Sequence, residues 1–289
     1  MYYQEIESVF RRNLETRYMS DIYLPEMFPA TVKSLMDARH VVILTGFVVK
    51  AAKAGETDGP PGALSLACCF KKLAVQVTLV TDAINESIVR VGLEALALDV
   101  PLVVASDVTM EALAEELFVT ASASHLIAIE RPSRAADDEC YSMRGEKITE
   151  YVANTDILVT RAKEFGVTTI GIGDGGNEVG MAVIKEYVHG HVPMGPKICA
   201  TTEVDYLLIG GVSNWVAYGI CGALSVEKGL FLLPEDEAEV VLIESMVKAG
   251  AVDGIEKRQV AKVDGIDMAG NLAILNAIRA LVAIYMKKN

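Results

Sequence analysis

Six short apolar runs recur along this chain, and each is followed by a stretch with the apolar spacing of a helix. The runs are rich in valine, isoleucine and leucine without polar alternation, which is typical of strands buried on both faces of a parallel sheet. They cover residues 40–46, 75–81, 101–105, 125–130, 167–172 and 205–210. This alternation predicts an α/β fold in which helices cover both faces of a doubly wound, mostly parallel sheet, a Rossmann-like three-layer sandwich.

The stretches between the runs are expected to be crossover helices. We predict these helices at 62–72, 85–98, 109–118, 147–165, 176–187 and 213–230. An amphipathic helix is expected at about 4–18, and another helical pattern covers about 268–286. Because no linker or repeat divides the sequence, we predict one α/β domain over 1–289. An N-terminal helical segment at about 1–35 and a segment at about 231–289 would complete it.

The charge balance excludes several classes of partner. Asp and Glu number 39 against 26 Lys and Arg, which gives a formal net charge of -13. This field would repel a polyanion, so no nucleic-acid partner and no anionic membrane surface is expected. A small anionic substrate remains compatible with the charge, because a local group of arginines can reverse the field inside one cleft.

The composition also bears on oligomeric state and location. Hydrophobic residues make up 52% of the sequence, and a homo-oligomer is expected if part of this excess reaches the surface. The five cysteines form no Cys-x-x-Cys pair, which favours reduced thiols over a structural zinc site. The N-terminal segment shows neither a signal-peptide nor a transit-peptide pattern, so we expect a cytoplasmic protein.

The turn GIGDGGNEVG at 171–180 lies between a predicted strand and a predicted helix. Gly171, Gly173 and Gly176 match the G-x-G-x-x-G spacing, whose backbone N–H groups can hold an anion. Two features argue against a dinucleotide: the turn follows the fifth predicted strand instead of the first, and Asp174 would lie beside the phosphates. A nucleotide- or phosphate-dependent enzyme is kept as an alternative.

The polar residues of the same turn favour a small-ligand site. Ligands of an open parallel sheet bind beyond the carboxyl ends of the strands, where this turn is expected. Gly175 and Gly176 would let Asp174, Asn177 and Glu178 approach a ligand closely, and the dipole of the following helix would stabilise the Glu178 anion. The structural alternative is that Asp174 caps the helix and the glycines only allow a tight turn.

Two further strand ends carry carboxylates. Glu56, Thr57 and Asp58 precede Gly-Pro-Pro-Gly, and their oxygens are candidates to bind a substrate ammonium or a divalent metal, Mg or Mn. A solvated acidic turn is the alternative at this position. Asp82 directly follows an apolar strand, so it is a candidate general base or a helix cap.

Arginines and amides follow other strands. Arg131, Arg134 and Arg144 follow the run at 125–130, and guanidinium groups recognise carboxylates with two parallel hydrogen bonds. Simple surface solvation is the alternative for any one of them. Ser213 and Asn214 follow the last run; together with Asn177 they are candidates for polar contacts to a developing oxyanion.

Several segments taken together resemble the D-glutamate cyclase family. They are ETDGPPG at 56–62, LVTD at 79–82, IERPSR at 129–134, SMRG at 142–145, TIGIGDGGNEVGM at 169–181 and GVSNW at 211–215. AVDG at 251–254 and VDG at 263–265 follow in the same order. An ordered set of this kind is far more specific than any single glycine pattern.

The resemblance implies a hydro-lyase that converts D-glutamate to 5-oxo-D-proline and water, with a small dicarboxylic amino acid as its substrate. From the chemistry, we assign the amine and proton transfers to Asp174 and Glu178, with Asp82 as a further candidate base. The arginines would hold the carboxylates, and Glu56 and Asp58 would bind the ammonium or the metal. No organic cofactor is expected. A non-catalytic amino-acid-binding protein is a second alternative.

Overall fold

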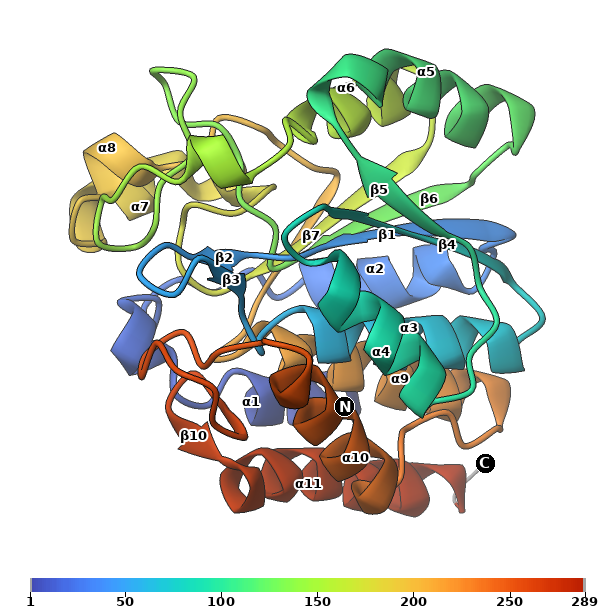
Figure 1. Cartoon of the computed structure of the whole chain (residues 1–289). Coiled ribbons are helices and arrows are strands. Elements are labelled where there is room, and N and C mark those ends of the chain that lie inside the picture. The colour runs from blue at the N-terminus through green and yellow to red at the C-terminus, as the bar shows by residue number, and fades with distance from the viewer. Residues whose placement is uncertain (1, 288–289) are drawn as a thin grey trace.

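The computed structural model describes residues 2–287 and is built around a six-stranded sheet (Figure 1). Every neighbouring pair of strands in this sheet runs parallel. Across the sheet the order is β5 (Leu102–Ala105), β4 (Gln76–Asp82), β1 (His40–Thr45), β6 (His125–Ile129), β7 (Thr168–Gly173) and β8 (Tyr206–Ile209). The chain thus winds outward from β1 in one direction and from β6 in the other, which confirms the predicted doubly wound α/β fold.

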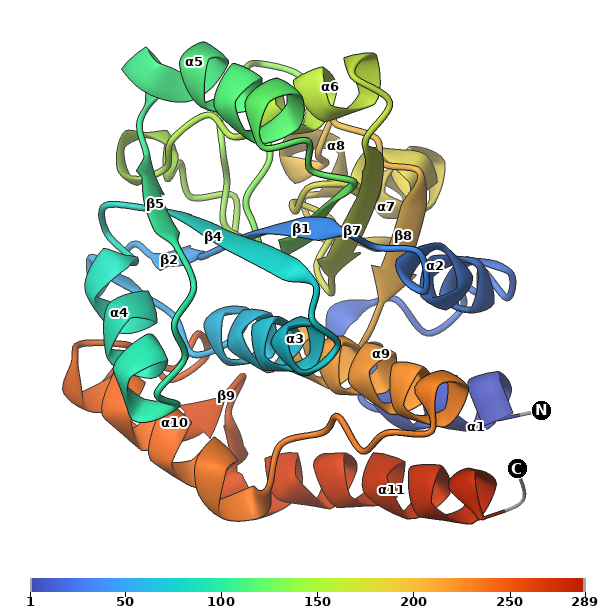
Figure 2. The same cartoon turned by 90° about the vertical axis from the view of Figure 1, so that its right-hand side faces the viewer.

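Different sets of helices cover the two faces of the sheet, as Figure 2 shows. One face carries α2 (Met27–Leu35), α3 (Pro60–Lys72), α4 (Glu86–Ala95) and α9 (Ser213–Lys228). The other carries α5 (Met110–Ala114), the π-helical segment η3 (Glu115–Thr120) and α6 (Asp156–Glu164). Shorter helices lie in the connections: η2 (Asp107–Thr109), η4 (Thr149–Tyr151), η5 (Met181–Ile184), α7 (Lys185–His191) and α8 (Gly195–Ile198).

Alternate residues of each strand pack into two separate hydrophobic cores, because successive side chains of a strand point to opposite faces. In β1, Val41 and Ile43 join the core beneath α3 and α9, whereas Val42 and Leu44 join the core beneath α5 and α6. All four side chains are fully buried. Burial on both faces explains why the strand sequences show no polar alternation.

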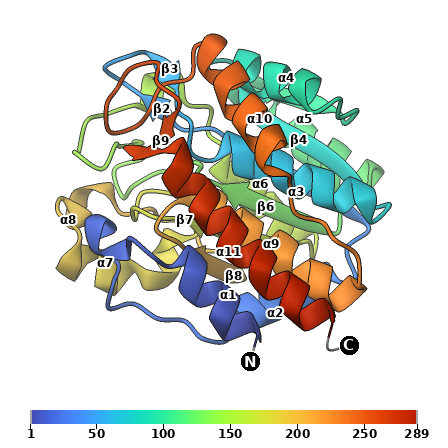
Figure 3. The same cartoon turned by 90° about the horizontal axis from the view of Figure 1, so that it is seen from below.

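An outer layer of helices covers α3, α4 and α9. It consists of α1 (Tyr2–Phe10), α10 (Asp236–Lys248) and α11 (Met268–Met286). Seen from below in Figure 3, α11 lies across α9 beside α1. Within residues 2–287, α11 alone is long and apolar enough to cross a membrane by length and composition. One side of it packs into the core through Ile274, Leu275, Ile278 and Val282.

Three predicted helices differ from the structure. The opening helix ends at Phe10 and resumes only as the single turn η1 (Leu14–Arg17), because Asn13 has a left-handed backbone with φ 72°. The expected helix at 147–165 begins at Asp156. The helix expected at 176–187 is absent over residues 176–180, where Gly176 and Gly180 have φ values of 108° and 100°, and an α-helix begins only at Lys185. A right-handed helix cannot contain such residues.

The carboxyl ends of β1 and β6 mark the point where the winding direction reverses. A crevice opens between the loops at such a point, because the two connections leave the sheet on opposite sides. Two small antiparallel pairs flank it: β2 (Val48–Val49) with β3 (Ala54–Gly55), and β9 (Lys262–Val263) with β10 (Ile266–Asp267). Figure 1 shows both pairs on the same side of the molecule.

Candidate active site

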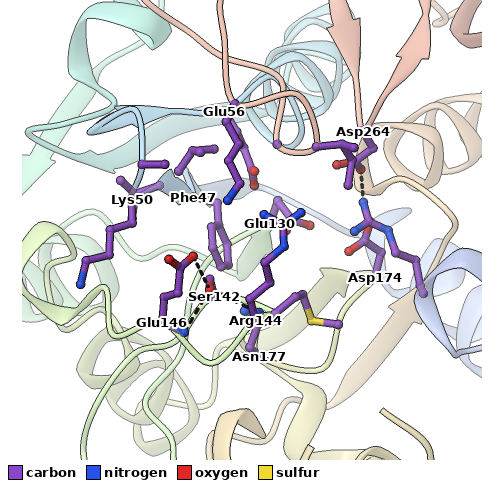
Figure 4. A pocket seen from close by; sticks show the side chains of 18 residues that line it. Phe47, Lys50, Glu56, Glu130, Ser142, Arg144, Glu146, Asp174, Asn177 and Asp264 are labelled. Atoms are coloured by element: carbon purple, nitrogen blue, oxygen red, sulfur yellow. Dashed lines mark hydrogen bonds and ion pairs between the residues drawn. The ribbon is translucent and has the colours of Figure 1, made fainter. Parts of the chain in front are cut away.

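A cavity of about 120 Å³ lies beyond the carboxyl ends of β1, β6 and β7. The loops after these strands supply Phe47, Glu130 and Asp174 to its lining, while distant segments of the chain supply Arg17 and Asp264. Figure 4 shows Asp174 and Asp264 together on one side of the cavity, with Lys50 and Glu146 on the other. The cavity therefore lies where the fold predicts a ligand site.

Carboxylates form the floor of the cavity. Glu56, Glu130 and Asp174 line it and are 8%, 6% and 2% exposed, and Asp264 lines it from the turn between β9 and β10. Asp58, Asp174 and Asp264 can bring oxygens within 4.8 Å of one another, and Glu130, Asp174 and Glu178 can do the same. Such a concentration of negative charge favours a cationic ligand, either an ammonium group or a metal ion.

Arg17 supplies positive charge to this floor from the N-terminal segment. Its Nη2 lies 2.9 Å from Asp174 Oδ2 and also forms an ion pair with Asp264 Oδ2. The Arg17 side chain is only 14% exposed, so this contact is shielded from solvent and strengthened accordingly. Its position follows from η1, a single turn with left-handed residues, Asn13 and Tyr18, on both sides.

Burial and mutual repulsion raise the pKa values of several floor carboxyls. Burial is the largest cause at Asp174, and Asp264 and Glu178 raise its pKa further, while Arg17 partly opposes them. Burial, followed by repulsion from Asp174, likewise raises the pKa of Glu130 well above the ordinary range. Burial and Asp264 raise the pKa of Asp58 to about 8. Carboxyls with raised pKa values beside a charge partner in a cavity are typical of acid–base sites.

Glu178 folds back into its own turn. Its Oε1 accepts hydrogen bonds from the N–H groups of Asp174 at 3.0 Å and Gly175 at 2.6 Å, and its Oε2 accepts one from Gly176 at 2.6 Å. Because residues 174–180 are not helical, the expected dipole stabilisation of Glu178 is wrong. The glycine-rich turn binds an anion, but that anion is the protein's own side chain, which argues against a phosphate in the same place.

The other polar positions of this turn have different environments. Asn177 lines the cavity; its Nδ2 donates to Tyr141 O at 2.6 Å, and its buried Oδ1 accepts no hydrogen bond from residues 2–287. Asn177 is therefore free to accept a hydrogen bond from a ligand. The N–H groups of Gly175 and Gly176 are already bonded to Glu178, so the expected contacts of these glycines with substrate are limited to close approach.

Asp82 and Arg131 pair with each other. Arg131 is fully buried, and its Nη1 lies 2.5 Å from Asp82 Oδ2. Arg131 also donates to Thr155 Oγ1, Gly46 O and Ala153 O, while Asn85 donates to Asp82 Oδ1. Neither side chain is among those that line the cavity. The structure thus gives this pair a role in supporting the loops after β1, β4 and β6 rather than in contacting substrate.

The other two predicted arginines lie apart. Arg134 donates to Asp138 O and lines a separate open hollow with Asp156. Arg144 is exposed and lines the cavity, as do Lys50 and Lys257. Arg144 is therefore the member of the predicted arginine group that the structure brings to the cavity. These three side chains can attract a carboxylate group of a ligand.

Thr57, Ser213 and Asn214 form a buried network with Asp58. Asp58 accepts hydrogen bonds from the backbone N–H groups of Gly59, Ser213 and Asn214, all at 2.9 Å, so it caps the start of α9. Asn214 bonds to Thr57 O, Gly59 N and Gly62 N, and Thr57 bonds to Lys262 O. Ser213 Oγ donates to Glu130 Oε2 at 2.6 Å and so contacts the floor directly.

The sequence prediction missed several charged lining residues, among them Arg17, Lys50, Glu130, Lys257 and Asp264. Glu130 and Asp264 lie within the segments IERPSR and VDG, and Glu130 also ends a predicted strand, so both segments held a signal. Arg17 lies in an opening stretch with ordinary amphipathic spacing. No local pattern distinguishes it from a surface arginine.

The chain is similar to known proteins over most of its length. A family model described as "D-glutamate cyclase-like, C-terminal" matches residues 6–279. The human protein "D-glutamate cyclase, mitochondrial" is 33% identical over 237 residues, which is 77% of this chain. The matched region spans 38% of the human protein.

Proposed function

The chain belongs to the D-glutamate cyclase-like family, and from this membership we propose that it is a lyase that converts D-glutamate to 5-oxo-D-proline and water. The observation that carries the proposal is the polarity of the cavity. Buried carboxylates form its floor, and Arg144, Lys50 and Lys257 add positive charge to its lining. Glutamate carries one ammonium group and two carboxylates, which complement these two regions.

The proposed reaction needs proton transfer and no co-substrate. The amine nitrogen must lose two protons as it forms a bond to the γ-carboxyl carbon. The departing carboxyl oxygen must gain two protons to leave as water. Atoms and charge therefore balance within the substrate, and the protein has only to carry protons from nitrogen to oxygen over a short path.

Asp174 and Glu130 are the residues best placed for these transfers. Both line the cavity, both are buried, and repulsion within the floor raises the pKa of each. We assign Asp174 to accept two protons from the ammonium one after the other and Glu130 to deliver two to the departing oxygen, with protons passing between these neighbouring carboxyls. Glu178 has its oxygens bonded to three N–H groups, so we assign it to holding Asp174 in position. Asn177 would orient the substrate through its free Oδ1.

A divalent cation fits the same floor. Asp174 belongs to both groups of carboxylates that can converge on one ion: one group adds Asp58 and Asp264, and the other adds Glu130 and Glu178. Glu56 belongs to neither group, and Asp58 already accepts three backbone hydrogen bonds. An all-oxygen set suits Mg²⁺ or Mn²⁺, and we propose Asp174, the carboxylate common to both groups, as its central ligand. When bound, the ion would polarise the γ-carboxyl group.

A chiral product assay tests the proposal. Purified protein is incubated with D- or L-glutamate, with Mn²⁺ or with a chelator, and 5-oxoproline is resolved by enantiomer. We expect product from D-glutamate, more of it with the metal present. Asp174→Asn and Glu130→Gln should each lower kcat/KM by about 100-fold or more, because each removes a proton carrier.

Matched control variants keep the assay specific. Asp99→Asn and Glu94→Gln change exposed acids far along the chain from the site segments, and kcat/KM should stay within about twofold of the wild type. Full activity of Asp174→Asn would refute the assignment of this residue. Binding of D-glutamate without any product would instead indicate an amino-acid-binding protein.

A further inference from the structure

A second cavity, of about 350 Å³, lies between α3, α4 and the start of α10. It shares no lining residue with the acidic cavity described above. Its walls are mainly apolar and include Leu96, Phe231, Leu233 and Leu242. This volume is within the range of small-molecule sites, roughly 300–1,000 Å³, which are typically apolar with a few polar groups.

Glu239 is a buried carboxylate in the wall of this cavity. It is 1% exposed, and Tyr218 donates a hydrogen bond to its Oε1. Its Oε2 is buried and accepts no hydrogen bond, and Glu239 forms no ion pair within residues 2–287. Burial raises the pKa of Glu239 to about 7. An ionised carboxylate with a free oxygen among apolar side chains is unfavourable unless a donor reaches it.

Ser65 provides a second free polar group. It lies in α3, is 3% exposed, and lines the same cavity as Glu239. Its Oγ forms no hydrogen bond with any residue that the structure describes. Most buried hydroxyl groups have a partner, so two free oxygens in one cavity indicate a ligand with hydrogen-bond donors.

The mouth of the cavity is open to a small molecule. Cys68 and Phe231 in its lining are half-buried, and Lys72 is exposed. The residues at the opening are polar and apolar, whereas the buried walls are apolar except for the oxygens of Ser65 and Glu239. A ligand therefore has to combine an apolar body with a compact polar group.

We propose that this cavity binds a small amphiphilic primary amine, whose ammonium group donates hydrogen bonds to Glu239 Oε2 and Ser65 Oγ. The apolar body of the ligand would pack against the leucines and Phe231. An acid would be repelled by Glu239, and a plain hydrocarbon would leave both oxygens without a donor. Glutamate fits poorly for the same reason, because it carries two carboxylates.

Matched probes of one shape test the proposal. Titration calorimetry on the full chain would compare 2-phenylethylamine, 2-phenylethanol and phenylacetate at slightly alkaline pH. We expect the amine to bind most tightly, the alcohol at least about tenfold more weakly, and the acid not to bind, because a hydrogen bond between charged groups is the stronger one.

Variants locate the bound probe. Glu239→Gln should weaken amine binding by about tenfold or more and leave alcohol binding nearly unchanged, since only the charge is lost. Ala238→Phe places a ring at a half-buried position of the lining and should block both probes. Glu237→Gln changes an exposed acid on the same helix and should have no effect. Circular dichroism checks that each variant is folded.

Two results would overturn the proposal. One is the absence of amine binding by the folded wild type at millimolar concentrations, which would mean that water satisfies the two oxygens. The other is equal binding of amine and alcohol by wild type and Glu239→Gln. If Glu239→Gln does not fold, the Ala238→Phe comparison still decides whether the probe occupies this cavity.

Discussion

The buried carboxyl groups of this protein differ in their hydrogen-bond and ion-pair partners. Asp174 lines the acidic cavity beside Arg17, Asp82 is held by a buried arginine, and Glu239 has one oxygen without a donor. Each of these acids is buried. The partner therefore decides the role of each carboxyl group: Asp174 is the proposed proton carrier, Asp82 supports loops, and Glu239 is an unfavourable buried charge.

The pKa of Glu239 makes stability depend on pH at this residue. Burial raises its pKa in the folded protein from 4.5 to about 7, so the folded state binds a proton that the unfolded state has lost between these values. The contribution of Glu239 is fully present below pH 4.5 and is lost as pH rises through 7. Glu239→Gln should therefore gain unfolding free energy relative to the wild type between pH 5 and pH 8, by about 2–3 kcal/mol.

Chemical denaturation of both proteins at several pH values measures this gain. Glu237→Gln, an exposed acid on the same helix, should show no such trend. A difference between Glu239→Gln and wild type that stays constant with pH would mean that Glu239 keeps its ordinary pKa when folded.

The residue scale is also where prediction from sequence was weakest. Asp82 and Asp174 both follow apolar strands, and nothing in the local sequence separates them. Their environments differ because Asp82 pairs with Arg131, which comes from the loop after β6, two strands away in the sheet, whereas Asp174 pairs with Arg17 from the N-terminal turn. Such partners are set by tertiary contacts between distant segments, which a single sequence does not display.

At the scale of elements, the six strands were predictable, whereas three of the predicted helices were not, and the turn after β7 shows why. Continuous apolar runs gave all six strands of the sheet, because burial on both faces leaves no other pattern for them. The turn after β7 was expected to continue as a helix over 176–187. Gly176 and Gly180 prevent this with their left-handed backbones, and Glu178 replaces the missing helical hydrogen bonds by accepting three N–H groups.

Glu178→Gln tests the role of this side chain. Its amide nitrogen cannot accept a hydrogen bond, so at least one N–H group of the turn would lose its partner. We expect a loss of about 2–4 kcal/mol in unfolding free energy, together with lower turnover because Asp174 is displaced. Glu186→Gln, an exposed acid in α7, is the matched control. Unchanged stability of Glu178→Gln would show that the turn does not depend on these bonds.

At the scale of the whole molecule, distant segments meet at the acidic cavity. Arg17 in η1 forms ion pairs with Asp174 after β7 and with Asp264 between β9 and β10. All six strands of the sheet lie between Arg17 and Asp264 in the sequence. The ion-pair partners of Arg17 come from other segments of the chain. The packing of η1 and of the β9–β10 turn against the sheet therefore determines the charge of the floor.

A double-mutant cycle measures this coupling. Arg17→Gln alone leaves two carboxylates facing each other and should cost about 3 kcal/mol of unfolding free energy. Asp264→Asn relieves part of that repulsion, so the double variant should be more stable than the sum of the single changes by about 1–2 kcal/mol. Arg12→Gln, at an exposed position nearby, is the control. Additive effects would show that the pair is not coupled.

The meeting of Arg17 with Asp264 also affects how the protein is made. During synthesis, Arg17 leaves the ribosome early, but Asp264 follows only after every strand of the sheet. Until then, Arg17 can pair with Asp174 alone, and the turn between β9 and β10 that closes the floor does not yet exist. Contacts between such distant positions form late, because closing a long loop costs entropy. A nascent or truncated chain could therefore build the sheet and still lack the site.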